Sequence, residues 1–225
     1  MSTTPGSAAT QTRAPRRAPA QRRAQIADAA RDLALDEGLS AVTMRAVATR
    51  AGVTPALVAH YAPSMDALVA DTFATIVGDE LDELDELDAL TESGPALERL
   101  ATLVGTLLDG SRDDVTLVWV EAFAMGRRSE PLAEAVRDHM DRWQKALHSL
   151  IDDGIAEGDF RIDDAADAAW QLLGMIDGLN AQALVRWGGA SDRSLLLRRA
   201  VEGMFGLSRG ALDVPPTTPR KVATP

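Results

Sequence analysis

The sequence predicts an all-α protein. Its 225 residues are dominated by alanine, leucine, aspartate and arginine, while aromatic residues make up 4% of the chain. This composition favours helices and is poor in the residues that strands prefer. Apolar residues also recur at the 3.6-residue period of a helix along most of the chain. With 46% hydrophobic residues, the predicted helices have enough apolar surface to form a normal core.

Two helices are predicted near the N-terminus. The first begins at Arg22, has Ile26 on its apolar face, and ends at Gly38, which suits a C-terminal cap. Thr43 is placed to cap a short second helix that Gly52 ends.

Two further helices follow directly. Thr54 before Pro55 is a strong start signal, because threonine caps a helix and proline fits its first turn, and this third helix runs to about Tyr61. Ser64 starts a fourth helix, which continues toward Leu84. The later periodic stretches predict helices at about 96–108, 115–126, 131–156, 164–187 and 192–207.

Several functional classes are disfavoured. The chain has no cysteine, so neither a disulfide nor a thiolate metal site is expected, and we expect no cofactor. It shows no catalytic motif, no secretory signal and no apolar run of membrane length, which predicts a cytoplasmic protein that is not an enzyme. Residues 1–70 have eight arginines and five acidic residues, a net charge of +3, whereas residues 71–225 carry −14. The N-terminal part is therefore the part suited to phosphate.

The second and third helices have the features of a helix-turn-helix. Such a unit needs a small residue where the helices cross, a glycine in the turn and branched apolar residues that fix the angle. Ala48, Gly52, Val53 and Val58 meet these needs. The alternative is a plain helical hairpin.

The stretch IADAARDLALDEGLSAVTMRAVATRAGVTPALVAHYAPSMDAL resembles the N-terminal domain of TetR-family regulators. The segment VTLVWVEAFAMGRRSEPLAEAVRDHMDRW and the later IDGL resemble the C-terminal domain of the branch that includes the choline-sensing betaine-pathway repressor. The proline-rich ends without apolar periodicity predict a flexible basic arm (1–21) and a disordered tail (211–225). Between them, the resemblance implies a three-helix DNA-binding domain with the helix-turn-helix (22–68) and a larger helical ligand-binding and dimerisation domain (69–210).

By this resemblance, one set of residues faces double-stranded DNA. Arg45 is the candidate for a base contact, with a surface salt bridge as the alternative. The basic residues before and within the first helix reach phosphate or a minor groove, or else form a solubilising tail. Ala62 and Met65 stand where the family usually has an aromatic residue and a lysine. The expected DNA-binding residues are Arg16, Arg17, Arg22, Arg23, Thr43, Arg45, Thr54, Pro55, Ala56, Leu57, Ala59, His60 and Tyr61.

A small-molecule effector is expected in the C-terminal domain, where all four tryptophans lie. Tryptophan suits pocket walls, although core packing is the alternative for each one. A buried Glu121 would need a cation, which favours an amine or quaternary ammonium ligand against indole faces. The candidate ligand-binding residues are Trp119, Glu121, Phe123, Trp143, Trp170, Asp177 and Asn180.

Small residues recur on the last two long helices, as in helices that meet across a two-fold axis, with ordinary intrachain packing as the alternative. The TetR-family resemblance implies a homodimeric, ligand-responsive repressor that leaves a palindromic operator when a small molecule binds. The alternative is a helical ligand-binding or interaction module with weakened DNA binding. The small residues include Ala165, Ala169, Gly174, Gly178, Ala200 and Gly203.

Overall fold

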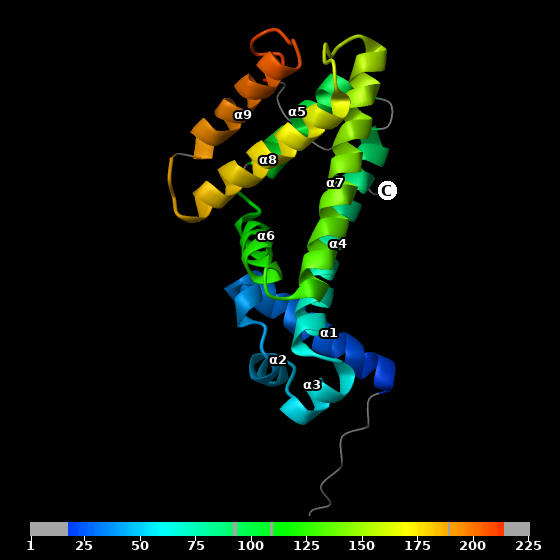
Figure 1. The fold of residues 1–225 in the computed structure, drawn as a ribbon, viewed down its shortest axis with the longest axis vertical. Helices are drawn as coiled ribbons and strands as arrows, with labels where there is room; N and C mark the ends of the chain where they lie inside the picture. Colours follow the sequence, from blue (N-terminus) through cyan, green and yellow to red (C-terminus); the bar gives the residue numbers. More distant parts are fainter. Residues whose placement is uncertain (1–17, 92–93, 109, 189, 214–225) are drawn as a thin grey trace, which may run out of the picture.

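The computed structural model describes residues 18–91, 94–108, 110–188 and 190–213. In these ranges the chain forms α-helices and one short 3₁₀-helix, η1, and contains no strand, which confirms the all-α prediction (Figure 1). The elements are α1 (Pro19–Glu37), η1 (Leu39–Ala41), α2 (Met44–Arg50), α3 (Pro55–Tyr61), α4 (Met65–Thr91), α5 (Ala96–Leu107), α6 (Asp113–Gly126), α7 (Glu130–Glu157), α8 (Ala165–Leu184) and α9 (Ala190–Met204).

The N-terminal helices form a three-helix unit around a small core. The Thr43 hydroxyl accepts the Ala46 N–H at 3.3 Å and so caps α2, and Thr54 caps α3 through the Leu57 N–H at the same distance. Ala48 and Val58 are buried where α2 and α3 cross, as predicted. These contacts fix the angle of the helix-turn-helix.

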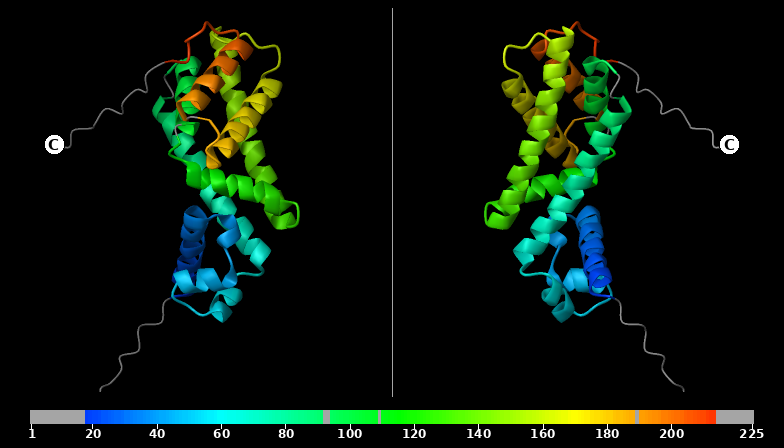
Figure 2. Two further views of the ribbon diagram at one scale, coloured as in Figure 1. Left: turned by 90° about the vertical axis from the view of Figure 1, so that its left-hand side faces the viewer. Right: turned by 90° about the vertical axis from the view of Figure 1, so that its right-hand side faces the viewer.

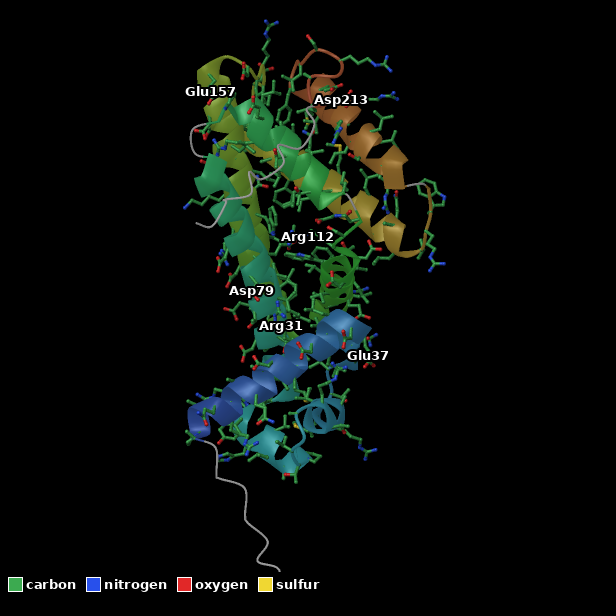
Figure 3. The ribbon with its side chains drawn as sticks, turned by 180° about the vertical axis from the view of Figure 1, so that it is seen from behind. Arg31, Glu37, Asp79, Arg112, Glu157 and Asp213 are labelled. Atoms are coloured by element: carbon green, nitrogen blue, oxygen red, sulfur yellow. The ribbon has the colours of Figure 1, made fainter. Side chains whose placement is uncertain are left out.

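Helix α4 joins the two halves of the molecule. It packs beside α1 at its start and runs alongside the long α7 further on (Figure 2). An ion pair between Arg31 and Asp79, 3.2 Å long, ties α1 to α4 (Figure 3). Helix α6 crosses between the halves and contacts α1 and η1 as well as α7 and α8.

The second core is enclosed by α5, α7, α8 and α9 (Figure 1). Asp164 caps α8 by accepting the Asp167 N–H at 3.0 Å. After α9, buried Glu202 accepts the Gly210 N–H at 2.8 Å and the Leu212 N–H at 3.2 Å. In the described part of the chain, no helix combines the length and apolar character needed to cross a membrane.

Two expected boundaries differ from the structure. Helix α1 begins at Pro19, so the last three residues of the arm expected at 1–21 belong to the first turn of α1. Proline favours this earlier start because its fixed φ suits the first helical turn. At the other end, Leu212 is fully buried inside the segment expected as a tail, and residues beyond Asp213 lie outside the described ranges.

Candidate DNA interface and ligand cavity

The expected DNA-binding residues of α2 and α3 lie at one end of the molecule, which is the end remote from α9 (Figure 1). Most of their side chains are exposed, whereas Leu57 and Tyr61 are half-buried. The rings of His60 and Tyr61 meet edge to face at a centroid distance of 5.0 Å. The exposed members are Thr43, Arg45, Thr54, Pro55, Ala56, Ala59 and His60.

The arginines near this surface differ in their partners. Arg45 is exposed and makes no ion pair with any described residue, so its side chain is available to another molecule. Arg50 instead pairs with Asp36 at 2.8 Å and Glu37 at 3.4 Å, and the hydrogen bond to Asp36 raises the pKa of its guanidinium.

The basic residues expected to contact DNA before and within the first helix divide into two groups. Arg22 donates to the Gln25 side chain at 2.8 Å, and Arg23 is exposed on α1. Arg16 and Arg17 lie outside the described residues.

Ala62 and Met65 support the fold of the DNA-binding unit. Ala62 is buried at the end of α3, and half-buried Met65 packs against the N-terminal core at the start of α4. The Ser64 hydroxyl accepts the Ala67 N–H at 3.0 Å, so the predicted restart of the helix is present. Met65 therefore supplies an apolar contact where the family usually carries a cation.

A cavity of about 40 Å³, which we call the central cavity, lies between α4, α6, α7 and α8. Four of the expected ligand-binding residues line it: Trp119, Trp143, Asp177 and Asn180. The remaining lining residues were not predicted, and they are Glu80, Leu107, Arg112, Thr116, Met140, Leu173 and Ile176.

Two carboxylates, Glu80 and Asp177, and the guanidinium of Arg112 lie in the lining of the central cavity. Glu80 is buried; one of its oxygens accepts the indole N–H of Trp119 at 3.3 Å, and the other lies 3.1 Å from Nε of Arg112. Burial raises the pKa of Asp177 to about 6, and the charge of Glu80 adds to that rise. The Asn180 amide N–H donates to the Leu107 carbonyl at 3.1 Å, which fixes the Asn180 side chain at the cavity wall.

Three expected ligand-binding residues do not line the central cavity. Glu121 points to the N-terminal unit, because two residues along a helix are separated by about 200° and Trp119 faces the cavity. Phe123 is exposed and lies against the Trp119 ring at a centroid distance of 5.6 Å. Trp170 is 71% exposed on the outer face of α8. The ligand role expected of these three residues therefore has no support from the central cavity and stays a prediction.

Glu80 was missed because it opens an acidic segment that reads as a solvated helix end. Its spacing nevertheless carried a signal, since Glu80 follows buried Phe73 by seven residues and Val77 by three. Positions separated by three, four and seven residues share a helix face. An acid on that buried face needs a partner inside the protein.

A larger cleft of about 730 Å³ opens between the N-terminal unit and the α6–α7 turn. Thr43 and Met65 line one side, and the exposed Arg127 and Arg128 line the other. It lacks the paired indoles and buried acids of the central cavity.

Comparisons with known proteins agree with this architecture. Residues 26–72 match the family model of bacterial regulatory proteins of the tetR family, and residues 95–206 match that of the BetI-type transcriptional repressor C-terminal domain. The HTH-type transcriptional regulator BetI of Rhizobium meliloti (strain 1021) is 31% identical over 160 residues, covering 70% of this chain and 75% of that relative.

Solved structures show the same fold. A transcriptional regulator from Saccharomonospora viridis in complex with choline has a TM-score of 0.72 and 25% identity, covering 81% of this chain and 96% of that one. A transcriptional regulator from Rhodococcus sp. Rha1 has a TM-score of 0.67 and 26% identity, with coverage of 86% and 99%. The chain belongs to the TetR family of bacterial transcriptional regulators, with a C-terminal domain of the BetI repressor type.

Proposed function

We propose that the effector of this repressor is a small organic cation of the quaternary ammonium class, such as choline, and that it binds in the central cavity. The observation that carries the proposal is the presence of two acids, Glu80 and Asp177, in one cavity with two indoles, Trp119 and Trp143. Choline in the Saccharomonospora viridis relative supports the same class of ligand.

The chemistry of the cavity favours a cation over other ligands. A carboxylate removed from water is costly unless a positive charge compensates it. A quaternary ammonium group cannot donate a hydrogen bond, so it is held by charge and by the faces of aromatic rings. Glu80 and Asp177 supply the charge, while Trp119 and Trp143 supply the rings.

We propose further that the chain acts as a homodimer on a palindromic operator. The face of α8 and α9 carries a groove of about 320 Å³ lined by Gly174, Gly178, Leu196 and Ala200. Trp170 and Trp187, 71% and 68% exposed, add large apolar side chains to this end of the molecule. Pairing two such faces would bury them and place two α3 helices on half-sites related by two-fold symmetry.

The DNA-binding role of the α2 and α3 surface is also a proposal, supported by its exposure and by the guanidinium of Arg45, which pairs with no acid among the described residues. A repressor acts where the chromosome lies, so we assign the chain to the cytoplasm and give it a regulatory role.

Calorimetric titration tests the effector class. Choline should bind the full chain, whereas 3,3-dimethylbutan-1-ol, which has the same shape without the charge, should bind far more weakly. Glu80→Gln should remove most of the choline affinity, and Glu134→Gln, an exposed acid on α7, should leave it unchanged. Equal binding of the neutral alcohol would contradict a cation site.

A further inference from the structure

In this structure the guanidinium of Arg112 forms an ion pair with the buried carboxylate of Glu80 in the central cavity. Arg112 is the residue directly before α6, and Figure 3 places it between α4 and the start of α6. Its Nε lies 3.1 Å from Oε1 of Glu80, with the two side chains only 19% and 7% exposed. Glu80 therefore has a positive partner before any effector arrives.

The size of the cavity means that an effector must displace something. A volume of about 40 Å³ is far below the roughly 300–1,000 Å³ of typical small-molecule sites. Glu80 is fixed within α4, which packs along α7, and Trp119 and Trp143 lie within helices. Arg112 lies in the connection between α5 and α6, at the edge of the cavity, and its side chain reaches solvent more than that of Glu80.

We propose that Arg112 is an intramolecular competitor of the effector: its guanidinium occupies Glu80 in the ligand-free repressor, and an incoming cation displaces it. This inference rests on the proposed cationic effector. The exchange explains why the site would prefer a cation to a neutral molecule. When a cation displaces Arg112, Glu80 still has a positively charged partner. A neutral molecule of the same shape would leave a buried carboxylate with its charge uncompensated, which is strongly unfavourable.

Displacement of Arg112 from Glu80 would also change how α6 is attached to α4. Arg112 at its start and Trp119 in its second turn both contact Glu80 of α4, so the ligand-free state ties α6 to α4 at two points. Displacing Arg112 releases one of them. The same helix reaches the N-terminal unit through Glu121, which connects the exchange to the helix-turn-helix.

The test compares choline binding to the full-length protein and to Arg112→Ala and Arg112→Gln, with Arg99→Ala as the matched control. Arg99 is also mostly buried, at 16% side-chain exposure, and its guanidinium lies 2.9 Å from the Asp153 carboxylate. Neither residue lines the central cavity. Without the competitor, the choline Kd should fall by about tenfold or more, the equivalent of one charge-assisted hydrogen bond. Arg112→Gln keeps most of the side-chain volume, which protects the test if Arg112→Ala does not fold.

A second probe separates this inference from the proposed effector. Methylguanidinium, which mimics the end of an arginine side chain, should bind saturably to Arg112→Ala and not to the wild type. If choline binds the wild type and both Arg112 variants keep the wild-type Kd or a higher one, the competitor role is wrong while the effector class stands. If choline binds none of the proteins, the effector class is wrong, and methylguanidinium then decides: binding to Arg112→Ala alone supports the inference, and no binding overturns it.

Discussion

Both carboxylate oxygens of Glu121, on α6, accept hydrogen bonds from Ser40, on η1. Oε2 accepts the Ser40 backbone N–H at 2.7 Å, and Oε1 accepts its hydroxyl at 2.9 Å. Ser40 lies three residues before Thr43, the cap of α2. The helix that lines the central cavity is therefore bonded to the segment that positions the helix-turn-helix.

Glu121→Ala should weaken the coupling between effector and DNA. The substitution removes both hydrogen bonds to Ser40 and leaves the central cavity intact, so choline should still bind with the wild-type Kd. Coupling between sites is typically worth about 1–3 kcal/mol, and most of it should be lost. Operator titrations with and without choline measure it, with Glu134→Ala as a control. If choline lowers the operator affinity of Glu121→Ala as much as that of the wild type, Glu121 does not transmit the effect of the effector to the helix-turn-helix.

Gly38→Ala should destabilise the protein more than Gly110→Ala. Both glycines have a positive φ, +92° and +83°, which costs other residues about 1–3 kcal/mol. A Cβ at Gly38 would also lie 2.7 Å from Oε2 of Glu121, whereas no atom of the described residues lies within 4 Å of one at Gly110. Thermal unfolding should show the larger fall in Tm for Gly38→Ala. Adding Glu121→Ala should narrow the gap, and a gap that stays the same would assign the excess cost to the backbone alone.

Choline affinity should rise as the pH increases through the pKa of Asp177, which is about 6. Below that pH Asp177 is protonated and adds no charge to the site; above it, the carboxylate attracts the cation. The bound cation lowers the Asp177 pKa, so affinity should gain about tenfold for each unit of that decrease as the pH goes from about 5 to about 7. Calorimetry across this range should show proton release near pH 6. Asp177→Asn should remove this release, and a persistent release would point to another group.

Arg45→Ala should relax sequence preference, by about 1–3 kcal/mol at one base pair per half-site. The reason is that Arg45 is exposed and pairs with no acid among the described residues, so it can reach a base edge. Arg16→Ala and Arg17→Ala should weaken binding to all sequences alike. Titrations on specific and scrambled DNA separate the two behaviours; a uniform loss for Arg45→Ala would make it a phosphate contact.

The sequence predicted the helices and the helix-turn-helix because their signals are local. The Thr43 and Thr54 caps and the buried Ala48 and Val58 follow from residues that are neighbours in the chain. The first boundary was missed although its signal is also local, because Pro19 was counted with the arm and not as the first residue of a helix.

The central cavity was only half predicted because it depends on contacts between distant segments. Trp119 and Asp177 were expected there, but Glu80 and Arg112 meet only when α4 and α6 pack together. Nor does composition distinguish Trp143, which lines the cavity, from Trp170, which faces outward, because both suit a pocket wall. The ligand roles therefore depended on helix orientation.

Fluorescence anisotropy of a labelled operator, selected by the protein from a random-sequence DNA pool, tests the central claim most directly. Choline should weaken operator binding by roughly 5- to 150-fold for the wild type, the usual range of allosteric coupling, and should have little effect on Glu80→Gln. Operator affinity that stays the same when choline saturates the wild type would contradict the account.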